Sequence, residues 1–398
     1  MSLRVLVIDR APPISRRQGN ALIGVEVFSR LAHHHLTLIA PATPAELREA
    51  PLLDGIFQDV HLVPRSRWTP ALAGSIEPAL AARVRSVPGL DLHAARALAR
   101  RIHGLGADGR FDVLHVRQLP MAGYAPLVRG PRRLLELIDS ETLGAERAQP
   151  ETWRTRLRSR LAAIEERRAM EGFDAVTTVA AADAARLRNL APSARVDVVP
   201  NGVDVVRFRT DPDVKRSLSA LVFVGAMSYP PNVAAMRYFS TEILPLVHRT
   251  RPDVRLTIVG RDPAPEVRAL ASPSIEVTGE VEDVRPYLSV ASLFVAPMIS
   301  GSGIKNKVLE AMAMECPVVA TPLAVEGLPV RSGEHALVAD TADRFAAAVV
   351  QLLADAEERS RVGTSGRALV EANYTWDACA ARYDRLYQEL AQMGGEPS

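Results

Sequence analysis

The stretch LFVAPMISGSGIKNKVLEAMAMECPVVAT, residues 293–321, contains one complete strand–loop–helix–strand unit. Two short apolar runs, LFVAP and PVVAT, enclose a loop of small residues and a helical segment that we expect to end near Cys316. A continuous apolar run predicts a strand that is buried on both faces, and two such strands joined by a helix run parallel. The stretch therefore predicts a parallel α/β sheet.

The same alternation of apolar runs and helical patterns extends outward in two series. The first series predicts strands at 4–9, 36–40, 60–63, 112–116, 134–138, 175–179 and 196–199. The second predicts strands at 220–225, 255–260, 275–279, 293–297, 317–321 and 336–340. Helices are expected between them, for example at 24–31 and 92–102, and after them at 341–356, 356–371 and 376–392.

The two series indicate two doubly wound domains of the Rossmann-like α/β class. An Asn201-Gly202 turn and the polar stretch 210–219 separate the series, which places the boundary near 205–218. We expect one domain over 1–210 and a second over 211–374. Open α/β sheets bind ligands at the carboxyl ends of their strands, so two such domains would face one another across a ligand-binding cleft.

Composition excludes several classes of protein. A length of 398 residues suits about two or three domains, and a net charge of +2 gives no overall basic field for nucleic acid. Two cysteines, Cys316 and Cys379, cannot form a disulfide framework or a multi-thiolate zinc site. No apolar run approaches the ~18 residues of a membrane span, and the first ten residues do not resemble a signal peptide. We therefore expect a cytoplasmic protein.

Lysine is rare in this chain, which has 48 basic residues but lysine only at 215, 305 and 307. Lys305 and Lys307 lie where the loop after residue 297 becomes a helix. A helix N-terminus attracts phosphate, whereas a cation there is unfavourable unless an anion binds. The pair predicts a phosphate or diphosphate site, the alternative being two solvated surface residues. Glu310 would then accept hydrogen bonds from a ribose diol, or else simply pair with Lys307.

Other candidate residues follow expected strands. Gly225 permits close backbone approach and Asn232 is an expected N-cap; Arg261 would point into the crevice or form a surface ion pair. In the first half, a long loop over 10–20 contains Arg16, Gly19 and Asn20. The side chains of Arg117 and Asp139 would lie at or just beyond strand ends.

Two further patterns are a run of three histidines and an apolar stripe on an arginine-rich helix. The adjacent residues His33, His34 and His35 cannot all face one metal, so we expect no metal site there. Trp153, Leu157, Leu161 and Ile164 form an apolar stripe on an arginine-rich helix. We expect this stripe to face the core. The alternative is a helix that lies on an anionic membrane surface, which would make the protein peripheral at the inner membrane face.

Four motifs give the chain a resemblance to retaining glycosyltransferases of family 4, of the two-domain GT-B type: PPISRRQGNALI at 12–23, PNGVD at 200–204, FVGAMSYPPN at 223–232 and GSGIKNKVLEAMAMECPVVATPLAVEGL at 301–328. The last resembles the subgroup associated with exopolysaccharide sugar transfer. The resemblance implies a nucleotide-diphosphate sugar as co-substrate in the second domain, an acceptor at the first, and neither metal nor other cofactor. It also implies that a final helix, about 375–393, packs back on the first domain.

The resemblance also assigns roles to single positions. Glu310 matches the second glutamate of the family's E-x7-E motif, and Ser302 replaces the first. Ala226 and about Asn232 stand where the family has an arginine and a lysine beside the diphosphate, and Arg117 replaces the second histidine of an H-x-H motif. We hypothesise that Lys305 and Lys307 replace the missing cations, with Arg261 as a helper.

These considerations predict the following site residues: Lys305, Lys307 and Arg117 as catalytic; Gly225, Arg261, Gly301, Ser302, Gly303, Ile304 and Glu310 as donor-binding; Arg16, Gly19, Asn20 and Asp139 on the acceptor side. The expected reaction is transfer of a sugar to a hydroxyl or amine of a glycan, lipid-linked or small-molecule acceptor, with retention by a front-face mechanism. Two alternatives stay open. One is a GT-B epimerase or hydrolase that acts on the donor alone, and the other is a non-catalytic nucleotide-sugar-binding partner protein.

Overall fold

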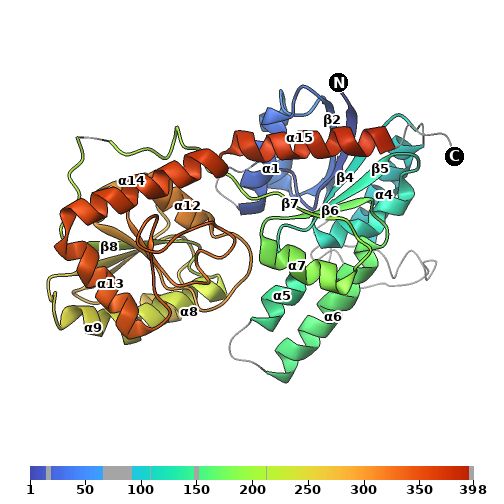
Figure 1. Cartoon of the computed structure of the whole chain (residues 1–398). Helices are drawn as coiled ribbons and strands as arrows, with labels where there is room; N and C mark the ends of the chain where they lie inside the picture. The colour runs from blue at the N-terminus through green and yellow to red at the C-terminus, as the bar shows by residue number, and fades with distance from the viewer. Residues whose placement is uncertain (15–18, 66–91, 108, 148–151, 212, 394–398) are drawn as a thin grey trace. The chain divides into compact units, whose positions relative to one another are not determined.

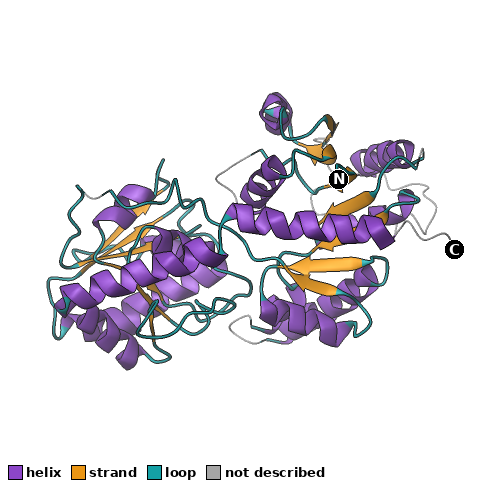
Figure 2. Ribbon diagram, turned by 45° about the horizontal axis from the view of Figure 1, so that its top comes forward, coloured by secondary structure: helices purple, strands orange, loops and turns teal. Residues whose placement is uncertain are grey.

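The computed structural model describes residues 1–14, 19–65, 92–107, 109–147, 152–211 and 213–393, and the chain forms two compact units. Unit 1 comprises Met1–Ala145, Trp153–Val199 and Trp376–Ser398, and unit 2 comprises Glu146–Thr152 and Pro200–Thr375. In each unit a central sheet is packed against helices (Figures 1 and 2). Arg16 lies outside the described residues.

Unit 1 is built on a seven-stranded parallel sheet with the order β3-β2-β1-β4-β5-β6-β7. Its strands are β1 (Arg4–Ile8), β2 (His35–Ala42), β3 (Asp59–Pro64), β4 (Val113–Arg117), β5 (Arg132–Glu136), β6 (Ala175–Thr178) and β7 (Val196–Val198). The order reverses direction between β1 and β4, which makes their carboxyl ends the topological switch point of the sheet. The seven predicted strands are confirmed, with small shifts at their ends.

The helices of unit 1 are α1 (Gly19–Arg30), α2 (Pro44–Arg48), η1 (Ala50–Leu53), α4 (Leu92–Gly106), η2 (Leu119–Leu127), α5 (Glu141–Glu146), α6 (Trp153–Met170), α7 (Ala181–Leu190) and α15 (Trp376–Met393). Leu98 and Ile102 on α4 are fully buried against strand residues such as Leu114. The last helix, α15, packs on α1, β4 and β5. None of the helices in the described ranges is long and apolar enough to cross a membrane.

Unit 2 contains a six-stranded parallel sheet with the order β10-β9-β8-β11-β12-β13. Its strands are β8 (Ala220–Val224), β9 (Arg255–Val259), β10 (Ile275–Gly279), β11 (Leu293–Ala296), β12 (Val318–Ala320) and β13 (Leu337–Val338). Its helices are α8 (Pro230–Tyr238), the π-helical turn η3 (Phe239–Ile243), α9 (Leu244–His248), α10 (Pro265–Arg268), α11 (Arg285–Val290), α12 (Asn306–Ala313), α13 (Ala342–Ala354) and α14 (Ala356–Asn373). The switch point lies between β8 and β11. Two parallel sheets of this kind confirm the predicted α/β fold class.

One expectation about packing is wrong. The apolar stripe of α6 faces solvent: Trp153 is 70% exposed, Leu157 48%, Leu161 54% and Ile164 47%. The residues of α6 that are buried are Ala162, Glu166 and Met170, which occupy another face of the helix. That face packs on α7 and η2. Ala162 is small and the Glu166 carboxylate is hydrogen-bonded, so both can be buried in this contact.

Candidate functional site

Three loops converge at the carboxyl edge of the unit 2 sheet, after β8, β9 and β11. A Cβ on Gly260 would lie 1.7 Å from the carbonyl oxygen of Gly225, so only glycine permits this approach of the first two loops. The Met227 N–H also donates to the Arg261 carbonyl oxygen at 2.8 Å. A Cβ on Gly301 would contact Pro231 at 3.5 Å, which brings the third loop against the first. The loops thus meet at the switch point of the sheet, where α/β folds bind ligands.

Lys307 extends from the first turn of α12 into this junction. Its Nζ lies 2.5 Å from Asn232 Oδ1, and Asn232 Nδ2 donates to the Ala226 carbonyl oxygen at 2.9 Å. The ammonium also lies 4.3 Å from the centroid of the Phe223 ring, a favourable cation–π contact. A Cβ on Gly225 would lie 3.0 Å from Lys307 Nζ and 2.6 Å from Asn232 Nδ2. Glycine at position 225 therefore leaves the room that these two side chains occupy.

Burial shifts the pKa values of two α12 side chains toward one another. It lowers the pKa of Lys307 to about 7, with a smaller contribution from the charge of Lys305. It raises the pKa of Glu310 to about 7, against the opposing effects of Lys307 and Arg207. A phosphate group beside Lys307 would favour the charged ammonium and raise this pKa.

Lys305 behaves differently from Lys307. It occupies the N-cap position of α12 and is 9% exposed. Its Nζ donates to the carbonyl oxygens of Ser302 at 2.8 Å and Gly303 at 2.5 Å. Gly301 and Gly303 take positive φ angles of 103° and 68°, which fold the loop so that these carbonyls point at the ammonium. Lys305 therefore holds the shape of the loop over Gly301–Ile304, in which Ile304 is buried.

The other residues predicted in unit 2 have mixed surroundings. Arg261 is exposed and pairs with the adjacent Asp262 at 3.3 Å. The expectation that Asn232 is an N-cap is wrong: α8 begins at Pro230 after the N-cap Tyr229, and Asn232 lies inside the helix with its side chain turned to Lys307. Asn201 Nδ2 donates to Asn306 Oδ1 at 3.0 Å, which fastens the PNGVD segment to the start of α12.

Arg117 lies in unit 1 at the end of β4 and is 1% exposed. Its guanidinium contacts Asp9 and forms two hydrogen bonds with Glu136, at 2.9 and 3.1 Å. Burial opposes ionisation of Glu136, but Arg117 and His115 outweigh it and lower the pKa of Glu136 to about 2. Arg117 Nη2 also donates to the Asn20 carbonyl oxygen at 3.1 Å. The arginine thus joins three strand ends to the start of α1.

The carboxylates that surround the predicted residues of unit 1 were not among the candidates predicted from the sequence. Asp9 and Glu136 at strand ends were not proposed, although an arginine at a strand end is a signal that such partners exist. Asp139 is half-buried after β5, and its neighbours Ser140 and Thr142 donate to the buried Glu166 of α6 at 3.1 and 2.6 Å. Gly19 and Asn20 are exposed at the start of α1.

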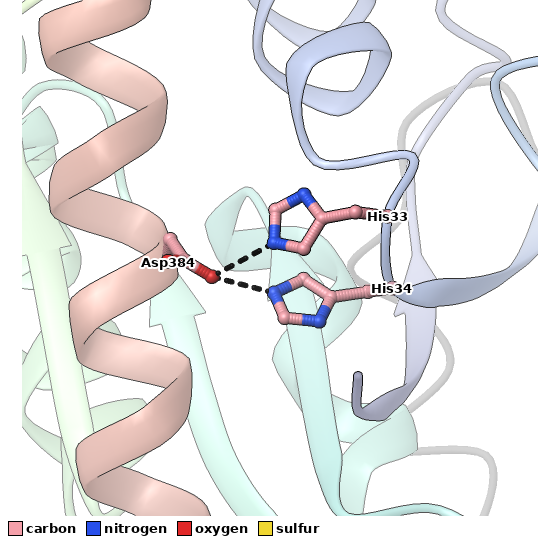
Figure 3. Close-up of side chains that lie close together, drawn as sticks. All are labelled: His33, His34 and Asp384. Carbon is pink, nitrogen blue, oxygen red and sulfur yellow. Dashed lines mark hydrogen bonds and ion pairs between the residues drawn. The ribbon is translucent and has the colours of Figure 1, made fainter. Parts of the chain in front are cut away.

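His33, His34 and Asp384 are close enough together to suggest a metal site (Figure 3). His33 Nε2 lies 3.2 Å and His34 Nε2 lies 2.7 Å from Asp384 Oδ1. His34 Nδ1 accepts a hydrogen bond from the Leu3 N–H at 3.1 Å, so in the neutral ring the proton is on Nε2 and is donated to Asp384. A metal ligand at Nε2 would need that proton removed. The cluster fits a hydrogen-bonded anchor for α15 better than a metal centre.

Two family models match the chain. The model described as Glycosyltransferase Family 4 matches residues 28–207, and that described as Glycosyl transferases group 1 matches residues 219–355. The second match includes the three loops and α12.

Curated relatives and solved structures agree with these models. A GDP-mannose-dependent alpha-(1-6)-phosphatidylinositol monomannoside mannosyltransferase of Mycobacterium tuberculosis is 30% identical over 54% of this chain and 62% of its own length. A phosphatidyl-myo-inositol mannosyltransferase of Mycobacterium leprae is 29% identical over 50% of this chain and 54% of its own. The chain thus spans little more than half the length of these relatives.

Among solved structures, a sucrose-phosphate synthase from Thermosynechococcus elongatus superposes with a TM-score of 0.72 and 17% identity, covering 98% of this chain and 100% of that one. This likeness concerns the fold alone. The two family models together match most of the chain and show that it belongs to the group 1, family 4 glycosyltransferases, and the structural likeness agrees with the GT-B fold.

Proposed function

We propose that this protein is a retaining glycosyltransferase that transfers a sugar from a nucleotide-diphosphate sugar to an acceptor hydroxyl or amine. The observation that carries the proposal is the position of Lys307 Nζ at the junction of three loops, beside Asn232 and Gly225. A cation at the carboxyl edge of a doubly wound sheet, next to a helix N-terminus, suits a diphosphate.

We assign the residues of unit 2 as follows. Lys307 contacts the diphosphate and stabilises the charge that develops on it as it leaves, the catalytic role proposed from the sequence. Glu310 accepts hydrogen bonds from the ribose, and the loop Gly301–Ile304 surrounds the phosphates with backbone N–H groups. Lys305 takes a positioning role because its ammonium holds this loop in shape. Arg261 is the further cation available to the diphosphate.

In unit 1, we propose that Arg117 is a positioning residue and that Asp139, Gly19 and Asn20 lie on the acceptor side. Arg117 is enclosed by carboxylates and holds the Asn20 carbonyl, so it acts through the start of α1. In the proposed reaction the bond from the anomeric carbon to the diphosphate breaks and a bond to the acceptor oxygen or nitrogen forms on the same face. The acceptor's proton passes to the leaving diphosphate, and no enzyme nucleophile is required.

GDP-mannose is the first donor to test, because the Mycobacterium tuberculosis relative is described as GDP-mannose-dependent and the match includes about half of each chain. The names of the two relatives also suggest phosphatidylinositol and its mannosides as the first acceptors to test. A glycan or small-molecule acceptor is the alternative that the same site would accommodate.

The direct test is calorimetric binding of GDP, UDP and their sugars, followed by product analysis with and without acceptor. Transfer with a retained anomeric configuration, seen by NMR of the product, supports the proposal. Release of free or epimerised sugar without acceptor would indicate a hydrolase or epimerase. Donor binding with no turnover would indicate a non-catalytic binding protein, an outcome to which Ser302 in place of the family's glutamate gives a specific reason. Absence of nucleotide binding would overturn the proposal.

A further inference from the structure

The exposed apolar stripe of α6 is the feature of unit 1 that the proposed reaction does not use. It consists of Trp153, Leu157, Leu161 and Ile164, which we call the α6 stripe. These four side chains are 47–70% exposed. At 3.6 residues per turn they fall within an arc of about 80° along the whole helix. Singly exposed apolar side chains need no explanation, but a continuous stripe of four on one helix does.

The stripe is exposed because another face of α6 already provides the contacts with unit 1. That face carries the half-buried Thr155 and Ser159 and the buried Ala162, Glu166 and Met170. Glu166 accepts hydrogen bonds from the Thr142 hydroxyl at 2.6 Å and the Glu141 N–H at 2.6 Å, which fixes the rotation of α6 about its axis. Turning the apolar side of the helix inward would break these hydrogen bonds and leave the donors at Glu141 and Thr142 without their partner.

Arginines lie on both sides of the stripe. Arg156, Arg160 and Arg167 lie along one edge, Arg154 and Arg158 along the other, and Arg168 lies near its C-terminal end, as the helical period of 100° per residue places them. All six are exposed. The Arg154 guanidinium lies 5.3 Å from the centroid of the Trp153 ring. Exposed acidic groups on α6 itself are confined to Glu165.

An open groove of about 460 Å³ includes three residues of the stripe in its lining. It is lined by residues of α6 and by one residue of α5: Trp153, Arg154, Leu157, Arg158, Leu161, Ala162, Glu165 and Glu141. The apolar side chains of this lining would contact an acyl chain, and Arg154 and Arg158 would contact the anionic head group attached to it.

We propose that the α6 stripe and its flanking arginines form a docking surface for a bilayer that contains anionic lipid. A helix with an apolar stripe, arginine flanks and a tryptophan has the composition of helices that lie in the membrane interface. The stripe would enter the boundary between head groups and acyl chains, and the arginines would contact lipid phosphates. A second copy of this chain is a poorer occupant, because a two-fold contact through this face would bring two sets of six arginines together.

This inference does not depend on the proposed reaction, and its test needs no donor or acceptor. The full chain is mixed with vesicles of phosphatidylcholine alone or of phosphatidylcholine with a third of phosphatidylglycerol, and bound protein is separated by flotation. We expect binding to the anionic vesicles that weakens as salt is added, and little binding to the neutral ones. Replacing Leu157 and Leu161 by glutamate should reduce binding at least about tenfold, because it removes apolar contact and adds repulsion.

The matched control is Leu52→Glu with Leu218→Glu, since these leucines are also exposed, at 62% and 68%, but lie outside α6. Both pairs of substitutions are on the surface, so thermal unfolding should change little. A second readout uses Trp153: in a Trp68→Phe background, its fluorescence should shift to shorter wavelength on anionic vesicles and be quenched by brominated lipid. Trp376 is 2% exposed and should not respond.

Three results would overturn the proposal: no binding of the unmodified protein to anionic vesicles, equal binding by the stripe variant and the control, or no change in Trp153 emission. Self-association that the stripe variant abolishes, without vesicle binding, would assign the surface to a second copy of the chain instead. Nucleotide binding by the stripe variant, measured separately, keeps this outcome distinct from failure of the proposed function.

Discussion

Lys307 Nζ lies 2.5 Å from Asn232 Oδ1. The ammonium group of a residue on α12 therefore contacts the side chain of a residue on α8. By resemblance to the family, position 232 is about where a lysine stands beside the donor diphosphate. The chain thus has a cation at nearly the same place, delivered from a different helix. This geometry supports the hypothesis of a replaced cation for Lys307. Lys305 has loop carbonyls as partners, and we propose a positioning role for it.

The first prediction is that replacing Lys307 weakens nucleotide binding but stabilises the fold. Lys307→Met should weaken binding of GDP or UDP roughly ten- to a hundredfold, because a hydrogen bond to a charged group contributes about 1.5–3 kcal/mol. It should also raise the unfolding temperature at neutral pH and below, since burial disfavours the lysine charge. Calorimetry and thermal unfolding measure the two effects. Lys215→Met, at an exposed lysine, should change neither.

The second prediction is a pH dependence of nucleotide binding. The pKa of Lys307 is about 7 in the free protein, so the protonated form that attracts phosphate is lost as the pH rises. Affinity for a nucleoside diphosphate should therefore fall by up to about tenfold for each pH unit above 7 until the pKa of the complex is reached. Lys307→Arg, which keeps its charge throughout this range, is the control. Identical pH profiles for the two proteins would contradict the assignment.

The third prediction is that the cation can be moved back to position 232. Asn232→Lys combined with Lys307→Met should recover most of the nucleotide affinity that Lys307→Met alone loses. Asn232→Lys alone should lower the unfolding temperature, because it places two ammonium groups side by side. Calorimetry on the three variants measures the recovery. A double variant that binds no better than Lys307→Met would show that the charge at this place is not what binds the diphosphate.

Strands and loops followed from the sequence because their signals are local. RLTIVG became β9 with Gly260 at its end, and the small-residue loop before Lys305 became the turn that α12 follows. A buried parallel strand is apolar throughout and ends at a glycine or polar residue, so few neighbours are needed to identify it.

The predictions that were wrong or incomplete concern features that depend on contacts between residues far apart in the sequence. The stripe of α6 looks like a core face, yet the hydrogen bonds of Glu166 with Ser140 and Thr142 select the opposite rotation. Asn232 resembles an N-cap by position, but the preceding prolines start α8 earlier and free its side chain for Lys307. The burial of Arg117 required Asp9 and Glu136, which lie on separate strands. The helical or strand periodicity of a sequence does not reveal which distant residues pair in this way.

The fourth prediction concerns this buried arginine. Arg117→Met should lower the free energy of unfolding by about 3–5 kcal/mol, because it leaves the buried carboxylates of Asp9 and Glu136 without their counter-ion. Urea unfolding measures the loss. Arg129→Met, at an exposed arginine of the same unit, should be nearly neutral. A loss no larger than that of the control would mean that the carboxylates are satisfied without Arg117.

The fifth prediction is a loss of stability in mild acid that depends on protonation of His34. Burial lowers the pKa of His34 below its usual value of 6.5, against the opposing effect of Asp384. Below pH 6.5 the unfolded chain therefore binds a proton that the folded chain still excludes, so the free energy of unfolding falls as the pH falls. In His34→Asn, the amide oxygen can still accept the Leu3 N–H but nothing titrates. Urea unfolding at a series of pH values should show a shallower decline for this variant, whereas His33→Asn, at an exposed ring, should retain the steep one. Parallel curves for all three proteins would show that the anchor of α15 to His34 does not sense pH.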